Sequence, residues 1–212
     1  MQRLAPNLLS LHVHWFLADC GNVLHDMAIG ELTRLTSLEV YLDVGLGDKV
    51  SYRLSDGISR LHSLALLSIH GFGLCRWQVD QALPFHIRLS LPPQLSMLQK
   101  LHTVTFTNAF ASLGRLSQLP CLQTLCYRET YPLVEDLRIP SSFGRLGNSL
   151  TRLDLSWGDI IGTYSSMTEL TCLKSLQLYY ICNDNYWVPL AAKNSVALHS
   201  VLARLSAHSP QP

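Results

Sequence analysis

The sequence predicts an α/β solenoid in which a curved parallel β-sheet lines the concave side and irregular turns with short 3₁₀ or α segments form the convex side. Three observations predict this fold class. Leucine supplies 42 of the 212 residues, far above its share in an ordinary domain. An apolar motif of the form Leu-x-x-Leu-x-Leu recurs seven times along the chain. A second apolar pattern, with a spacing of three, precedes most of these copies.

The seven motifs set the register of the repeat. Each has apolar residues at its first, fourth and sixth positions, as in Leu35, Leu38 and Val40. The motifs begin at the leucines numbered 8, 35, 64, 101, 122, 150 and 173, so the successive intervals are 27, 29, 37, 21, 28 and 23 residues. Most of these intervals lie within the roughly 20–29 residues of a strand-plus-turn repeat. The interval of 37 predicts an insertion near residues 73–90, packed on the solenoid or in contact with a partner.

Each repeat is expected to hold one turn of helix and one strand. Ile29 and Leu32 precede Leu35 at intervals of three, the spacing at which side chains align along a 3₁₀ helix. Within the motif the spacing changes to two, which places alternate side chains on one face of a strand. A single unit cannot bury its apolar side alone, so stacked units form a continuous apolar column.

The linkers between the motifs resemble those of the leucine-rich repeat family. Residues 139–146 read Ile-Pro-Ser-Ser-Phe-Gly-Arg-Leu, which is similar to the Ile-Pro-x-x-Leu-Gly-x-Leu of the plant and green-algal class. Residues 91–98 and 29–38 are similar to variants of that pattern. The resemblance covers residues 8–180, and it implies a scaffold without enzymatic activity that binds another protein on its concave strands.

The chain departs from that family at the turn after each strand. The family usually carries Asn or Cys there, stacked into a ladder that hydrogen-bonds the turn backbone. At the equivalent positions of this chain only Asp43 and Thr130 can replace them, while Asn108 and Asp159 lie one residue away. A buried backbone group without a partner costs about 1–3 kcal/mol. We therefore expect irregular turns, with Asn108 and Asp159 reaching the ladder only where the turn shifts.

The solenoid is expected to occupy residues 1–182 as one domain. Apolar residues at 198, 201, 202 and 205 form a single helical stripe, so residues 183–208 predict a C-terminal segment with a capping helix, followed by a disordered tail at 209–212. An exposed, partner-binding helix is the alternative. The N-terminal repeat has no candidate cap, which suggests a fragment of a longer protein, a degraded cap, or an edge that associates with a partner.

Candidate binding residues come from the positions between and just after the apolar ones. We expect the fifth, seventh and eighth positions of each motif, which include Leu42, to face the concave side. Tyr, Trp and Arg dominate many protein interfaces, although aromatic residues also simply favour strands. The predicted partner-binding residues are Tyr41, His70, Arg128, Asp154, Trp157, Tyr179 and Tyr180.

No catalytic, cofactor or metal site is expected. The segment Gly45-Leu46-Gly47-Asp48-Lys49-Val50 begins like a dinucleotide loop but lacks the third glycine. His70, Cys126 and Asp154 fall on three strands, too far apart for a nucleophile and its base. His12 and His14 share a strand face but have no third ligand nearby in the sequence, which argues against zinc.

Composition narrows the partner and the compartment. A net charge of +1 argues against nucleic acid, and no apolar run reaches the roughly 18 residues of a membrane span. The absence of Asn-x-Ser/Thr sequons favours a cytoplasmic protein, or an extracellular one if the chain is a fragment of a receptor ectodomain. Cys121 and Cys172 occupy equivalent repeat positions and are expected to be small buried residues.

Overall fold

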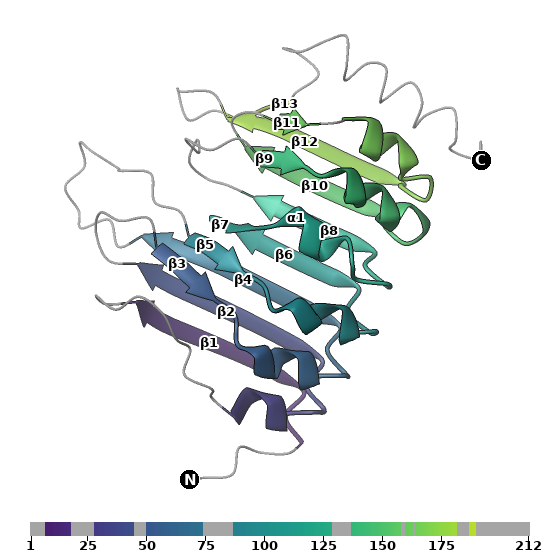
Figure 1. Cartoon of the computed structure of the whole chain (residues 1–212). Coiled ribbons are helices and arrows are strands. Elements are labelled where there is room, and N and C mark those ends of the chain that lie inside the picture. Colours follow the sequence, from purple (N-terminus) through teal and green to yellow (C-terminus); the bar gives the residue numbers. More distant parts are fainter. Residues whose placement is uncertain are drawn as a thin grey trace, which may run out of the picture.

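One long strand per repeat builds the principal sheet of the protein. The computed structural model describes residues 7–17, 28–44, 50–73, 87–128, 137–157, 160–162, 164–181 and 187–189. The strands stack side by side in the order of the chain (Figure 1). They are β1 (Ser10–Leu17), β2 (Ser37–Val44), β4 (Leu66–Gly73), β6 (Thr103–Thr107), β8 (Thr124–Arg128), β10 (Arg152–Trp157) and β12 (Ser175–Ile181). All neighbouring pairs in this series are parallel.

The strands pair in the register that the motifs predict. Leu38 lies opposite Leu67, and Leu67 lies opposite Val104, so equal motif positions meet across the sheet. The fourth and sixth positions point into the core, where Leu67 and Ile69 are fully buried. The alternate positions lie on the other face. We call this the concave face: the side of the sheet turned away from the helical turns.

In the principal sheet, a short helical turn precedes each strand from β2 to β12. The turns are η1 (Ala28–Glu31), η2 (Asp56–Arg60), η3 (Pro93–Met97), α1 (Leu113–Leu116), η4 (Ser141–Asn148) and η5 (Tyr164–Glu169). The leucine that follows each turn at the spacing of three is buried, as at Leu32 and Leu61. Ser55 caps η2 by accepting a hydrogen bond from the Gly57 N–H at 3.2 Å. The strand-and-turn solenoid predicted from the sequence is confirmed.

Five short strands on the convex side were not predicted. β3 (Val50–Arg53), β5 (Ile87–Ser90) and β7 (Ala109–Ala111) form one parallel sheet, and β9 (Leu137–Ile139) pairs with β11 (Ile160–Gly162) in another. In β5 the apolar residues Ile87 and Leu89 are buried and Arg88 is exposed. β5 lies inside the region 73–90 that the sequence analysis assigned to an insertion, so the end of that region joins the regular solenoid.

Asn108 hydrogen-bonds the backbone of a neighbouring repeat, which is the role expected of a ladder residue. Its φ of 50° is left-handed, and its Nδ2 donates to the Gly71 carbonyl of the neighbouring repeat at 3.2 Å. Its backbone N–H donates to the Arg128 carbonyl at 2.8 Å. Asn108 therefore links three repeats as the chain passes from β6 into β7. Of the other residues considered for the ladder, Asp43 lies half-buried in β2 opposite Phe72, and Thr130 and Asp159 lie outside the described residues.

Apolar residues from the principal sheet, from the sheet of β3, β5 and β7, and from the turns form one core. Its largest buried side chains include Tyr52, Phe106, Tyr127 and Phe143. Motif leucines at the two ends of the array, Leu8, Leu11, Leu173 and Leu176, are only partly buried. Fewer neighbouring repeats cover the ends of a solenoid, which explains this difference.

At the C-terminal end of the sheet the pairing changes direction. β13 (Trp187–Pro189) is antiparallel to β12, with Val188 opposite Tyr180. The expected helical stripe at 198–205 and the tail at 209–212 lie outside the described residues. Among the helices that the structure describes, none has the length and apolar character needed to cross a membrane.

Candidate protein-binding face

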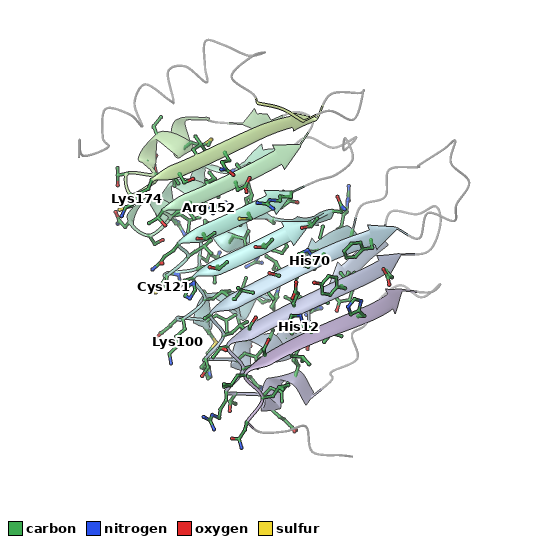
Figure 2. All side chains as sticks on the ribbon, turned by 180° about the vertical axis from the view of Figure 1, so that it is seen from behind. His12, His70, Lys100, Cys121, Arg152 and Lys174 are labelled. Atoms are coloured by element: carbon green, nitrogen blue, oxygen red, sulfur yellow. The ribbon has the colours of Figure 1, made fainter. Side chains whose placement is uncertain are left out.

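The concave face brings together side chains from neighbouring repeats (Figure 2). Of the predicted binding residues, Tyr41 lies in β2, His70 in β4, Arg128 in β8 and Asp154 in β10. The other three lie in β10 and β12, and the side chains of these residues are outside the described part: Trp157, Tyr179 and Tyr180. The four described residues form two separate groups rather than one.

The first group is an aromatic row across the first three strands of the sheet. We use this name for His14, Tyr41, His70 and Phe72. The His14 and Tyr41 rings stack with centroids 4.4 Å apart and planes 4° from parallel. Tyr41 and His70 follow at 4.9 Å and 21°, and Phe72 lies 5.7 Å from Tyr41. These spacings match the separation of neighbouring strands, so the parallel register itself produces the stack.

Glu39 contacts two side chains of the aromatic row and one neighbouring imidazole. Its Oε1 accepts the Tyr41 hydroxyl at 2.6 Å and lies 3.2 Å from His70 Nε2, while its Oε2 lies 2.6 Å from His12 Nδ1. The Tyr41 hydrogen bond is the main cause that lowers the pKa of Glu39. The same contact raises the pKa of Tyr41. Glu39 is therefore a carboxylate that holds one tyrosine and two imidazoles in place.

His70 is fixed from two sides. Its Nδ1 lies 3.1 Å from Thr107 Oγ1 on the next strand, and Glu39 lies near its Nε2. Burial lowers the pKa of His70, and Glu39 opposes that effect only in part. The imidazole is consequently biased towards its neutral form near neutral pH.

The second group is an ion pair on β8 and β10. Asp154 is fully buried, and its Oδ2 accepts from Arg128 Nη2 at 2.7 Å and from Arg128 Nε at 3.3 Å. Arg152 Nη2 lies 3.9 Å from the same oxygen. The guanidinium-bearing side chains remain 53% and 45% exposed respectively. One buried carboxylate thus positions two arginines that face solvent.

The eighth motif position does not behave as predicted. Leu42 in β2 is fully buried, so the expectation that it faces the concave side is wrong. Alternation along a strand puts the eighth position on the same side as the fourth and sixth. The predicted binding residues also left out His14 and Glu39, which the seventh and fifth motif positions place on the concave face, and the concave residues Phe72 and Arg152, which lie outside those positions. Phe72 is 42% exposed at the ninth position, and strict period-two alternation extended beyond the motif would have found it.

No nucleophilic site forms among the residues considered for one. Cys126 lies opposite Asp154 in the sheet, whereas His70 contacts Glu39 and Thr107 instead. Burial, with a smaller contribution from Asp154, raises the pKa of Cys126. Within the described ranges no cluster of His, Cys, Asp or Glu is suited to hold a metal ion.

A hollow of about 850 Å³ lies where β8, β10 and β12 begin. Its lining includes the polar residues Gln123, Asn148, Thr151 and Lys174. Cys121 and Cys172 also line it, and both are exposed free thiols, so the expectation that they are buried is wrong. They stand just before the first motif leucine, at the rim of the sheet rather than inside it.

Comparison with known proteins gives structural likeness only. No protein-family model matches the chain, and no curated protein matches it. An internalin, InlF, from Listeria monocytogenes gives a TM-score of 0.44 at 16% identity, covering 80% of this chain and 48% of the internalin. A leucine-rich repeat protein from Leptospira interrogans gives a TM-score of 0.23 at 15% identity, covering 82% of this chain and 73% of that protein. The chain spans about half the length of the internalin.

The repeat defines the class of protein. Seven motifs, each with a strand in one parallel sheet and most with a helical turn before it, are the architecture of a leucine-rich repeat solenoid. This chain has the fold of such a solenoid.

Proposed function

We propose that this protein is a binding module that docks another protein on the concave face of its solenoid. The observation that carries the proposal is the aromatic row. Four stacked rings from three repeats lie on an open sheet face, and Phe72 is 42% exposed there. Rigid aromatic side chains lose little entropy on binding and are common anchors in interfaces. We expect binding without catalytic turnover.

Removal of the row tests this proposal. We expect the double variant His14→Ala/Tyr41→Ala to remain folded, because His14 is exposed and Tyr41 half-buried. The variant should lose partners in a quantitative pull-down, since an interface anchor contributes about 2 kcal/mol or more, roughly a thirtyfold change in affinity. The control Arg115→Ala/Gln118→Ala removes two exposed side chains at α1 on the convex side. Equal partner lists for both variants would reject the concave face.

A second candidate is that the chain is the recognition part of a larger receptor-type or ubiquitin-ligase protein. The partial exposure of Leu8 and Leu11 favours it, since an adjoining repeat would cover these motif leucines. An upstream reading frame that continues the repeat would support this candidate. An in-frame stop codon directly upstream would exclude it.

We also propose a plant or green-algal repeat class and a cytoplasmic location. η4 begins at Ser141, directly after the Ile139-Pro140 pair of the class-like linker. The described cysteines, Cys121, Cys126 and Cys172, are free thiols, as expected in a reducing compartment. A fluorescent fusion found in the secretory pathway would contradict the cytoplasmic location.

A further inference from the structure

We propose that the partner segment is acidic, and that its Asp and Glu carboxylates bind the cationic group formed by Arg128, Arg152 and Lys174. This inference rests on the proposed docking function and specifies the chemistry of the docked chain. Arg128 ends β8, Arg152 begins β10 and Lys174 directly precedes β12. Figure 2 labels Arg152 and Lys174 at this half of the sheet.

Among the described residues on this half of the sheet the accessible charge is positive, although the whole chain is nearly neutral. Within the described part of β8, β10 and β12 the acidic residue is Asp154, which is fully buried. Arg128 and Arg152 are about half exposed, and Lys174 is exposed directly before β12. Among the described residues of these strands, an approaching molecule therefore meets two guanidinium groups and one ammonium group above one carboxylate.

The N-terminal half of the concave face has a different balance of acidic and basic side chains. Glu39 and Asp43 lie on β2, and Glu39 is already occupied by Tyr41, His12 and His70. Acidic and basic groups thus separate along the solenoid axis. Among the described strands, a partner with carboxylates gains the most Coulomb energy where it crosses β8, β10 and β12, so the charge pattern also favours one position along the axis.

Asp154 holds the guanidinium groups in place before a partner binds. Nε and Nη2 of Arg128 both point to Asp154 Oδ2, and Arg152 Nη2 lies 3.9 Å from the same oxygen. Holding flexible side chains before the partner arrives reduces the entropy lost on binding. Guanidinium groups bind carboxylates through short charge-assisted hydrogen bonds.

The hollow at the rim of the sheet lies next to the cationic group, because Lys174 lines it. Thr151, which precedes Arg152, lines it together with Lys174, Gln123 and Asn148. Amide, hydroxyl and ammonium donors therefore lie at this rim, where Figure 2 labels Lys174 and Arg152. Several separate donors suit an extended peptide with several carboxylates better than a single small anion.

Fluorescence anisotropy at low ionic strength tests the inference with three labelled dodecapeptides: alternating Glu and Ser, alternating Gln and Ser, and alternating Lys and Ser. The Glu peptide should bind the whole chain about tenfold more tightly than the Gln peptide, the effect of one charge-assisted hydrogen bond. The variant Arg152→Glu/Lys174→Glu should lose this preference and gain affinity for the Lys peptide. Arg128 is left intact because it covers a buried carboxylate.

The control Arg60→Glu/Arg115→Glu carries the same charge change on exposed convex residues and should keep the preference for the Glu peptide. Equal binding of the Glu and Gln peptides by the wild-type chain would overturn the inference. Tighter binding of a single-stranded RNA dodecamer than of the Glu peptide would overturn it as well. Either result leaves the aromatic-row pull-down unaffected, so the failure of this inference and the failure of the proposed function are distinguishable.

Discussion

At the scale of single residues, the concave face is held by two carboxylates that sequence reasoning treated differently. Asp154 was predicted as a binding residue, but the structure places it beneath Arg128 as a support. Glu39 was not singled out, although it contacts Tyr41, His12 and His70. The register placed the fifth and seventh motif positions correctly on the concave side, but not the eighth. It could not predict which side chains contact each other, because side-chain reach depends on length and on the neighbours in adjacent strands.

Removing Arg128 should destabilise the protein more than removing Arg152. Arg128→Ala leaves the buried Asp154 carboxylate with a cation 3.9 Å away. We expect a loss of about 1–3 kcal/mol in the free energy of unfolding, discounted for the half-exposed arginine. Arg152→Ala should cost below about 1 kcal/mol. Urea unfolding measures both values.

The double variant Arg128→Ala/Asp154→Asn provides the control for this pair. It removes the buried charge together with its partner, so it should be more stable than Arg128→Ala alone. Equal losses for Arg128→Ala and Arg152→Ala would show that Asp154 does not depend on Arg128.

Acidification should weaken the fold through His70 and Glu39. Burial lowers the pKa of His70 below its ordinary 6.5, so the unfolded chain binds a proton first as the pH falls through that value. The hydrogen bond from Tyr41 lowers the pKa of Glu39 below its ordinary 4.5, which has the same sign in a more acidic window. Both contributions are complete at neutral pH and are lost on acidification.

Urea midpoints between pH 8 and pH 5 measure the contribution of His70. His70→Gln should flatten the decline that begins near pH 6.5, because the variant has no imidazole to protonate. The exposed His102 serves as the matched control, and His102→Gln should leave the decline unchanged. An identical pH profile for His70→Gln and the wild type would show that His70 does not cause the decline in stability.

At the scale of elements, the strand and the turn of each repeat could be predicted because their spacings differ. The change from three to two marks where η2 gives way to β4, and both lie where the motif predicts. The convex strands β3 and β5 could not be predicted with the same rule. They are four residues long, too short for a periodicity to stand out, and pairing between repeats stabilises them.

The close approach of β4 and the turn at Asn108 should make Gly71 intolerant of a side chain. A Cβ on Gly71 would lie 2.6 Å from the Asn108 carbonyl oxygen, a backbone atom. We expect Gly71→Ala to cost about 1–3 kcal/mol, as overpacking does. Gly114 lies in α1, and a Cβ added there would be 3.6 Å from the nearest atom. The control Gly114→Ala should therefore leave the stability of the protein equal or raise it slightly. Equal thermal midpoints for the two variants would contradict this account of the turn.

At the scale of the whole molecule, the solenoid separates its core from its working surface. The core runs from Ile29 to Leu170 through every intervening repeat, so the face that carries Tyr41 and Arg152 contributes little to it. This separation explains why the leucine count and spacing predict the fold so well. They contain no information about the identity of the partner, which depends on the alternate positions alone.

Site-specific photocrosslinking tests the central claim, docking on the concave face, most directly. Benzoylphenylalanine is placed at Thr124, half-buried on the concave side of β8, and in a second variant at Gln118, exposed beside α1 on the convex side. The proposed function predicts a specific covalent adduct, identified by mass spectrometry, from position 124 and none from position 118. The same partner captured equally from position 118, or captured there alone, would contradict the claim.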